Sequence, residues 1–506
     1  MADRNQEYVY LLMDIVLATI NAKWIHPSLA LKLLKVNLGE LEESCEILEF
    51  ALRQPLNEKI QPILAARPKV LGLSVSIWNH KATLELLKEL SEKWAGADGS
   101  REKPLIVLGG PEVSYLSEDV EIFRYADYVI RGEGEESFRL LCHEIFSGRK
   151  DAAKVMTGAP VNVNKIVSPY RLYTDEELNR KLVYVEAARG CPFACEFCSC
   201  SIMNRVPDSC NELVKSVREF PLESFLAEMG ILIKRGGRTF KFLDRTFNLN
   251  MGRVKRIMEF FLEHIDALIA ADAVKDRPLC VHFEMVPFLF PSELKDILRR
   301  FPPESLRLEL GIQTLNQQTA SLIHIAGESG AAKLQSAGRQ TWTILENLEF
   351  LRKETNAIIH ADLIAGLPGE DFTSFGSGFD QLWQVLSGVP GSPFEIQLGI
   401  LKCLPGTPII RHSETHKMLY AAEPPYEVIA TGALHKPELD RIKNFARFWE
   451  LIVNRNPFPE ILPVLLPSGE PAFEKFMMLS DELLEKLGRN WGIDREELRA
   501  CVYNFA

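Results

Sequence analysis

Three closely spaced cysteines constrain this chain more than any other feature of its sequence. Cys191, Cys195 and Cys198 follow the spacing C-x3-C-x2-C and come just after an apolar run at residues 182–188. Three thiolates can bind three irons of a 4Fe-4S cluster, which leaves the fourth iron without a protein ligand and open to a small molecule. The spacing therefore predicts a catalytic cluster rather than a structural one.

Two other uses of these cysteines fit the sequence less well. A zinc site usually takes a second pair of ligands, and Cys200, Cys210 and Cys280 do not form one. Ten cysteines in 506 residues are too sparse for a disulfide framework, and residues 1–10 lack the basic start of a secretory leader. We therefore expect reduced thiols and a cytoplasmic protein.

Length and charge narrow the class of protein further. At 506 residues the chain is long enough for more than one domain. The apolar run at residues 8–20 is interrupted by Asp14 and is too short to cross a bilayer, so we expect no membrane segment. A net charge of -11 without long Lys/Arg blocks argues against a nucleic-acid partner.

Residues 1–150 alternate strand-like apolar runs with helical periodicity, which is typical of a doubly wound parallel sheet. Ligands of such sheets bind at the carboxyl ends of the strands. The loops expected there span residues 19–27, 74–80, 109–114 and 131–135. These loops hold most of the glycine and small polar residues, and the glycines at 109–110 would let a bulky ligand approach the backbone closely. The candidate contacts are Ser74, Ser76, Gly109, Gly110, Gly132 and Glu133.

The segments at 71–76 (LGLSVS), 109–114 (GGPEVS) and 126–135 (ADYVIRGEGE) resemble the cobalamin-binding domain found upstream of many radical SAM enzymes. This resemblance covers residues 8–148 and implies a Rossmann-like, flavodoxin-like domain whose cobalamin contacts are the six residues just given. The pattern Asp-x-His-x-x-Gly is missing, so the resemblance implies cobalamin bound base-off, without a protein histidine on cobalt. His26 and His80 are read as ordinary loop residues. His26 as an alternative ligand, or a domain that has lost the cofactor, stays open.

Beyond a linker at residues 151–180, strands and helices alternate again and predict a partial (β/α)6 barrel of the TIM type at residues 181–402. The expected strands are 182–188, 239–243, 280–285, 306–312, 358–364 and 394–401. The expected helices are 222–234, 253–264, 292–299, 342–353 and 372–386.

The cysteine loop followed by such a barrel resembles the radical S-adenosylmethionine (SAM) superfamily. In that family the amino and carboxylate groups of SAM chelate the fourth iron, and one electron splits SAM into methionine and a 5'-deoxyadenosyl radical. The resemblance implies SAM contacts at the carboxyl ends of the strands, including an adenine contact of Ile364 in a segment where Asp362 replaces the family's first Gly. The implied residues are Phe197, Asp244, Glu284, Glu309, Gln313 and Ile364. A buried Glu309 could instead pair with a neighbour such as Arg307.

Residues 403–506 show helical patterns at about 437–453, 472–487 and 495–502. They resemble an uncharacterised C-terminal extension found in one branch of cobalamin-dependent radical SAM proteins. We expect this mostly helical extension to close the barrel and shape the substrate pocket, and we expect Cys200 and Cys403 to be buried and inert.

Together these resemblances imply a cobalamin-dependent radical SAM enzyme that methylates an unactivated carbon of a small-molecule, natural-product-like substrate. Its electron would come from an external donor, flavodoxin or ferredoxin. Cobalamin-assisted cyclisation or rearrangement is an alternative that the sequence does not separate from methylation. A methylthiotransferase would need more cluster cysteines upstream, where only Cys45 and Cys142 precede residue 191. A non-catalytic cobalamin sensor is the remaining alternative.

Overall fold

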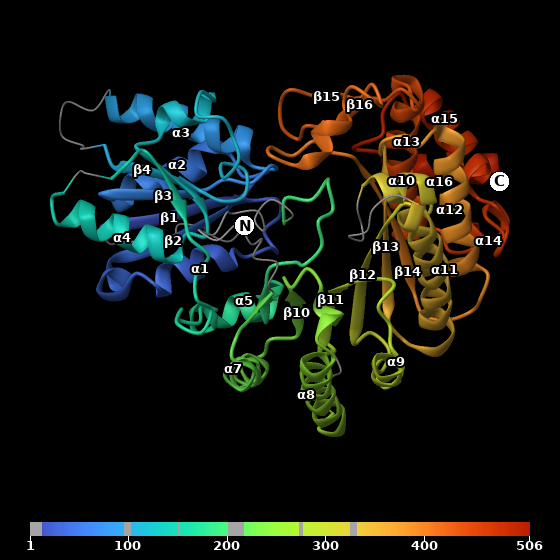
Figure 1. Cartoon of the computed structure of the whole chain (residues 1–506), viewed down its shortest axis with the longest axis horizontal. Coiled ribbons are helices and arrows are strands. Elements are labelled where there is room, and N and C mark those ends of the chain that lie inside the picture. Colours follow the sequence, from blue (N-terminus) through green and yellow to red (C-terminus); the bar gives the residue numbers. More distant parts are fainter. Residues whose placement is uncertain (1–12, 96–102, 150–151, 201–216, 273–276, 324–330) are drawn as a thin grey trace. The chain divides into compact units, whose positions relative to one another are not determined.

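The computed structural model describes residues 13–95, 103–149, 152–200, 217–272, 277–323 and 331–506 (Figure 1). The chain divides into two compact units. The first consists of Met1–Val185 with Glu223–Gly237, and the second of Glu186–Leu222 with Arg238–Ala506. Each unit is described on its own below.

The first unit is built on a parallel sheet with the strand order β2-β1-β3-β4-β5-β6. Its strands are β1 (Ile15–Asn21), β2 (Cys45–Ala51), β3 (Val70–Ser74), β4 (Leu105–Gly109), β5 (Tyr128–Gly132) and β6 (Val155–Gly158). This order is that of flavodoxin-like sheets, in which the switch in strand order places a ligand crevice at the carboxyl ends of the strands. The predicted doubly wound, Rossmann-like fold is confirmed.

Helices cover both faces of this sheet (Figure 1). Helices α1 (Leu29–Val36) and α4 (Glu135–Phe146) contact each other, as do α2 (Leu56–Ala66) and α3 (His80–Ala95). Strand β1 is buried along its whole length because both of its faces are covered. The short helical turns η1 (Gly39–Ser44) and η2 (Glu121–Tyr125) complete the connections.

The segment that we expected to be a linker has structure of its own. After β6 it forms η3 (Tyr170–Leu172) and α5 (Asp175–Arg180), followed by β7 (Val183–Val185). The Lys32 Nζ lies 3.0 Å from the Glu177 carboxylate, and the Val167 amide donates to Asn37 Oδ1 at 2.8 Å. Residues 152–180 therefore pack within the first unit, to which most of α7 (Leu222–Lys234) also belongs.

Within the second unit, neighbouring strands are parallel in the order β14-β13-β12-β11-β10. They are β10 (Thr239–Phe242), β11 (Cys280–Met285), β12 (Leu306–Gln313), β13 (Ile358–Ala365) and β14 (Phe394–Ile400). Helices α8 (Met251–Ala270), α9 (Ser292–Leu298), α10 (Gln317–Leu322), α11 (Ala331–Glu354) and α12 (Phe372–Ser387) follow them in turn. This βα alternation confirms the predicted barrel-type fold. A short antiparallel pair, β8 (Ala188–Arg189) and β9 (Arg218–Glu219), precedes the sheet.

The two faces of this sheet differ in chemistry. Along β12, four fully buried apolar residues alternate with half-buried Arg307, Glu309, Gly311 and Gln313. The apolar face packs under the helices, as the contact of the Phe240 and Phe261 rings at 5.4 Å illustrates. The opposite face, called the polar face below, carries Lys241, His282, Glu284, Glu309, His360, Asp362 and Glu395.

The C-terminal region is mostly helical, as predicted. It contains η5 (Pro408–His412), β15 (Leu419–Tyr420), β16 (Val428–Ala430), α13 (Lys436–Trp449), η6 (Glu450–Asn454), α14 (Leu462–Leu465), α15 (Phe473–Leu487) and α16 (Arg495–Phe505). An aromatic cluster fastens it to α12, because the Phe379 ring contacts Phe445, Trp449 and Phe473. Among the helices that the structure describes, none is both long and apolar enough to span a membrane.

Candidate active site

The cysteine loop begins directly after β8, and its three thiols are half-buried. The loop turns back on itself where the Cys198 amide donates to the Cys195 carbonyl at 3.1 Å. The Phe193 ring meets Phe288, beyond β11, edge-on with centroids 6.1 Å apart. The loop is therefore folded and anchored rather than extended.

The thiols of this loop influence one another electrostatically. Burial, together with the neighbouring Cys198 and Cys191, raises the pKa of Cys195 to about 12. A hydrogen bond with Cys198 is the largest of the effects that raise the pKa of Cys200. Among the residues that the structure describes, no three His, Cys, Asp or Glu side chains already surround a common metal position. Metal binding would therefore require the thiols to rotate and to lose their protons.

Asp244 follows β10 and organises the chain that enters the cysteine loop. It is buried, and its Oδ2 accepts a hydrogen bond from the Ala187 amide at 2.9 Å. Arg253 donates to the Ala187 carbonyl at 2.7 Å. Burial raises the pKa of Asp244 to about 8. Backbone at both Ala187 and Ala188 thus binds the Asp244 carboxylate, and its contact with SAM stays a prediction.

Glu284, at the end of β11, forms an ion pair with Arg245. The Arg245 Nη1 lies 3.1 Å from Glu284 Oε2, and both side chains affect the pKa of Cys191. Burial raises the pKa of Glu284 although Arg245 opposes this effect. The structure therefore brings Glu284 into electrostatic contact with the cysteine loop.

Glu309 is paired within the polar face. Its Oε2 lies 2.9 Å from Lys241 Nζ and 3.1 Å from His282 Nε2. These partners are on β10 and β11, and Arg307 is not one of them. Burial opposes ionisation, but the nearby His282 imidazole and the Lys241 ammonium, which donates a hydrogen bond, lower the pKa of Glu309 to about 2. Glu309 is an anion at neutral pH.

Asp362 lies on the same face of β13, and sequence reasoning did not assign it a role. Burial, together with the charges of Glu309 and Glu284, raises its pKa to about 8. Within the described part of the chain, its Oδ1 has no hydrogen-bond partner. The signal that could have found it was the carboxylate standing where the related motif has glycine. Nearby, the His360 Nδ1 lies 3.2 Å from Glu395 Oε2.

The remaining predicted residues of this unit lie at the same edge. Gln313 ends β12 at a bulge and has a φ of 68°, a left-handed conformation that side chains other than glycine rarely adopt. Ile364 shares the face of Asp362 because side chains alternate along β13, and it lies opposite Gly399 of β14. Phe197 is half-buried within the cysteine loop.

In the first unit, the predicted loops meet at the carboxyl ends of β3, β4 and β5. Gly110 has a φ of 108°, and a Cβ there would lie 2.6 Å from the Val75 carbonyl oxygen. Ser114 links two of the loops, since its Oγ donates to the Gly110 carbonyl at 2.8 Å and accepts from the Gly132 amide at 3.1 Å. These close approaches require glycine at position 110.

A buried asparagine that the sequence did not single out orders the loop after β3. The Asn79 side chain accepts from the Ser76 amide at 2.8 Å and donates to the carbonyls of Ile20 at 3.0 Å and Ser74 at 3.2 Å. It thereby joins the ends of β1 and β3, where Ser74 and Ser76 lie. Two tryptophans that the sequence analysis also missed, Trp24 and Trp78, are each 52% exposed at these strand ends.

The histidines of this edge are paired. The His80 Nδ1 lies 2.9 Å from Glu112 Oε1, and the His26 Nδ1 lies 2.8 Å from the Tyr184 hydroxyl. Glu133 accepts a hydrogen bond from the Val161 amide at 2.7 Å, so part of its carboxylate is bound to the segment after β6.

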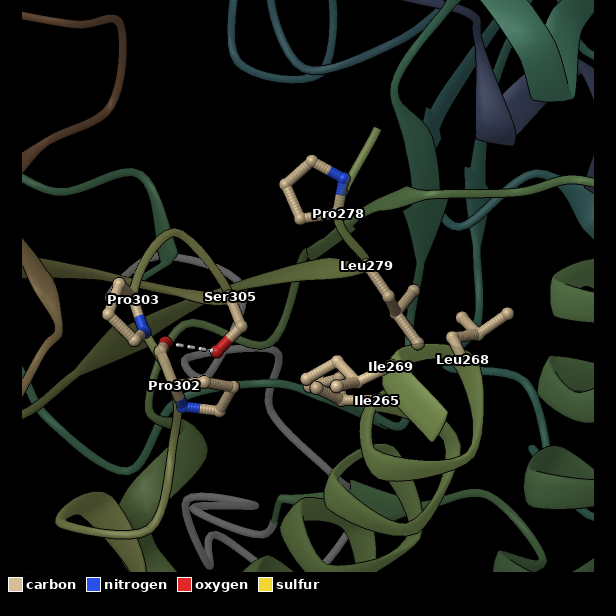
Figure 2. Close-up of a pocket in the computed structure, with 8 residues that line it drawn as sticks. All are labelled: Ile265, Leu268, Ile269, Pro278, Leu279, Pro302, Pro303 and Ser305. Carbon is tan, nitrogen blue, oxygen red and sulfur yellow. Dashed lines mark hydrogen bonds between the residues drawn. The ribbon is translucent and has the colours of Figure 1, made fainter. Parts of the chain in front are cut away.

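A small apolar pocket lies elsewhere (Figure 2). It is lined by Ile265, Leu268, Ile269, Pro278, Leu279, Pro302, Pro303 and Ser305. These residues precede β11 and β12 or end α8, so the pocket is at the amino ends of the strands. Asp244 and the chain entering the cysteine loop are at the carboxyl end, so this pocket is not part of the candidate site.

Comparison with known families supports the division seen in the geometry. The family described as "B12 binding domain" matches residues 15–141, and the family described as "Radical SAM superfamily" matches residues 185–377. The second match includes the cysteine loop and the strands β10 to β13.

Three curated relatives match parts of the chain. An uncharacterized methyltransferase, PH0819, of Pyrococcus horikoshii is 32% identical over 31% of this chain and 37% of the relative. The cobalamin-dependent radical SAM methyltransferase TokK of Streptomyces tokunonensis is 28% identical over 28% of this chain and 23% of the relative. A tRNA-2-methylthio-N(6)-dimethylallyladenosine synthase of Xanthomonas campestris is 24% identical over 62% of this chain and 61% of the relative. The chain thus spans less than two thirds of the length of each.

Among solved structures, the cobalamin-dependent SAM radical enzyme OxsB with aqua-cobalamin bound aligns with a TM-score of 0.60. The alignment covers 97% of this chain and 84% of OxsB at 13% sequence identity. At that identity the likeness concerns the fold.

Proposed function

We propose that this chain, which carries a B12-binding domain followed by a radical SAM domain, is a cobalamin-dependent radical SAM enzyme that methylates an unactivated carbon of a small-molecule, natural-product-like substrate. The observation that carries the proposal is the folded three-thiol loop beside the polar face, inside the stretch that the radical SAM family matches. Two relatives described as methyltransferases support the type of reaction.

The donor set fits an iron–sulfur cluster. Cys191, Cys195 and Cys198 are soft thiol ligands within one turn-rich loop, and their mutual effect on pKa places them within electrostatic range of each other. Together with SAM, a bound cluster would supply the carbon-centred radical that the reaction needs. The three cysteines are the residues we assign to hold it.

The chain's own side chains bind and orient the rest of the site. Asp244 fixes the entry to the cysteine loop through the Ala187 amide. Phe197 and Ile364 offer apolar contacts for the adenine of SAM, and Gln313 offers an amide. Glu284 and Glu309 offer carboxylates for its polar groups, and Asp362 carries a proton at neutral pH that it can donate.

The crevice of the first unit suits a large planar ligand. Gly109, Gly110 and Gly132 keep side chains away from the strand ends, and Ser74, Ser76 and Glu133 supply polar groups. His26 and His80 have partners in the protein, which supports cobalamin bound without a histidine on cobalt.

Reductive cleavage of SAM consumes an electron that no residue of the chain supplies. We therefore propose an external donor of the flavodoxin or ferredoxin type, and a cytoplasmic setting in which the thiols stay reduced. Both belong to the proposal rather than to the observed geometry.

The first test removes the thiols. Anaerobic protein is reconstituted with iron, sulfide and hydroxocobalamin and is then given SAM and dithionite. We expect wild-type protein to release 5'-deoxyadenosine. The variant with Cys191→Ala, Cys195→Ala and Cys198→Ala should lose both iron and this release but keep cobalamin. Iron binding or deoxyadenosine release equal to wild type in the variant would refute the cluster assignment. Cobalamin binding without any SAM cleavage by wild type would favour the sensor.

The second test separates methylation from rearrangement. SAM carrying a CD3 group is supplied with an anaerobic small-molecule extract, and the products are analysed by mass spectrometry. Methylation predicts a product that carries the deuterated methyl group. A product formed without label would favour cyclisation or rearrangement.

The match to a tRNA methylthiotransferase covers more of this chain than the matches to PH0819 and TokK do. Methylthiotransfer is therefore the second candidate function. It would require additional cluster ligands upstream of residue 191. The only cysteines there, Cys45 and Cys142, are 1% and 0% exposed and belong to the apolar core of the first unit. Neither is available as a metal ligand without unfolding that core.

A further inference from the structure

One residue of the cysteine loop is set apart by its burial. Glu196 stands directly after Cys195, and it alone among residues 191–200 is fully buried, at 2% exposure. A carboxylate is costly to bury unless it is paired and hydrogen-bonded. The buried Glu196 carboxylate therefore requires charged or hydrogen-bonding partners.

Those partners come from the C-terminal region. The Glu196 Oε2 lies 2.8 Å from His412 Nε2, and the Arg411 guanidinium donates to Glu196 Oε1. The backbone of Glu196 is also hydrogen-bonded, because the Ile409 amide donates to the Glu196 carbonyl at 3.0 Å. The Glu196 amide in turn donates to the Ile323 carbonyl at 3.1 Å.

The turn that supplies these contacts is itself fixed. Ile409 is 0% exposed and Thr407, just before η5, is 1% exposed. The His416 amide donates to the His412 carbonyl at 2.9 Å, and the His416 carbonyl accepts from Gly432 at 2.7 Å. The turn η5 is thus a rigid support for the loop, and it lies beyond the stretch matched by the radical SAM family, which ends at residue 377.

We propose that Glu196 is a positioning residue that, through His412 and Arg411, holds the cysteine loop in the conformation that receives the iron–sulfur cluster. Residues 407–412 of the C-terminal region are then part of the cluster-binding structure and not only a cover for the barrel. This inference rests on the proposed function, because it presumes that the three thiols bind iron.

The test compares matched variants. Glu196→Gln removes the negative charge of the contact, and His412→Ala removes the imidazole. The double variant removes both. His412→Gln keeps a nitrogen donor and serves as the conservative rescue. Glu414→Gln changes an exposed carboxylate two residues beyond His412 and serves as the control.

The readouts are iron and sulfide bound per chain, the EPR spectrum of the reduced cluster, and the rate at which a chelator removes iron. Partners that orient metal ligands typically change metal affinity about 10-fold to 100-fold. We expect iron loss to be faster by that order in Glu196→Gln and His412→Ala, with an altered EPR spectrum. The double variant should be no worse than the worse single one, because the two residues act as a unit. His412→Gln and Glu414→Gln should resemble wild type.

Equal iron retention and unchanged EPR spectra in all variants would overturn the proposal, as would strictly additive effects in the double variant. Should Glu196→Gln fail to fold, the contrast between His412→Ala and His412→Gln decides the matter alone. If wild-type protein binds no iron, the proposed function itself is refuted. If wild type and variants all bind iron equally, only the positioning role of Glu196 is refuted.

Discussion

Asp362 is a residue whose protonation changes near neutral pH. Its carboxyl has a pKa of about 8 against an ordinary value of 3.8, so the folded state holds the proton more tightly than the unfolded state does. The resulting stabilisation is fully present below about pH 4 and is lost as the pH rises through 8. We expect Asp362→Asn, which cannot ionise, to become more stable relative to wild type as the pH rises from 5 to 8, by about 3–4 kcal/mol.

Thermal midpoints of cluster-free protein at several pH values measure this difference. The control is Asp266→Asn, which changes an exposed carboxylate on α8. A stability difference between Asp362→Asn and wild type that stays constant from pH 5 to pH 8 would mean that Asp362 is ionised in the folded protein.

Gln313 combines backbone strain with a position at the proposed SAM site. Its φ of 68° costs a residue with a Cβ about 1 kcal/mol, which glycine avoids. We expect Gln313→Gly to match or exceed the thermal midpoint of Gln313→Ala, and both variants to bind SAM more weakly than wild type in equilibrium dialysis. Unchanged SAM binding in both would remove Gln313 from the site.

The sequence predicted single residues well where local rules apply. The alternation of side chains along β12 predicted that Glu309 and Gln313 share one face, and the burial pattern of the strand follows that alternation as far as the bulge before Gln313. The partner of Glu309 was beyond sequence reasoning because Lys241 lies 68 residues away and meets it only across three strands of the folded sheet. The burial of Glu196 was hidden for the same reason, since its partners lie more than 200 residues later.

At the scale of elements, the loop after β4 is tightly constrained by geometry. Gly110→Ala would place a Cβ 2.6 Å from the Val75 oxygen at a φ of 108°, at a cost on the order of 1–3 kcal/mol. We expect this variant to retain less cobalamin while its iron content stays at the wild-type level.

Gly148→Ala is the matched control for that variant. Gly148 also has a positive φ, of 78°, but nothing lies within 4 Å of a Cβ built there. It should keep its cobalamin. Equal cobalamin loss in both variants would point to general destabilisation of the first unit rather than to the crevice.

Elements with a strong period were predicted to within a few residues. Strand β11 was expected at 280–285 and is found at Cys280–Met285, and helix α7 was expected at 222–234 and is found at Leu222–Lys234. Residues 151–180 were expected to be a linker because the short elements found there, such as α5, have too few turns to show a hydrophobic period. Their order comes from long-range contacts such as that between Lys32 and Glu177.

At the scale of the whole molecule, charge bears on the tRNA alternative. A polyanion such as tRNA binds mainly by contacts between Lys or Arg and phosphate, which weaken steeply with salt. With a net charge of -11, we expect no salt-sensitive shift of bulk tRNA in an electrophoretic mobility assay at low salt. A shift that disappears as salt rises would favour the methylthiotransferase.

The two faces of the second unit's sheet divide its tasks. The apolar face supplies most of the packing against the helices, whereas the polar face contributes charges and hydrogen bonds but little apolar contact. A substitution on the polar face therefore disturbs the packing of the helices little, provided that it leaves no buried charge without its partner. Evolution or protein engineering can therefore change residues of the polar face, and with them the molecule that is bound, while the fold is kept.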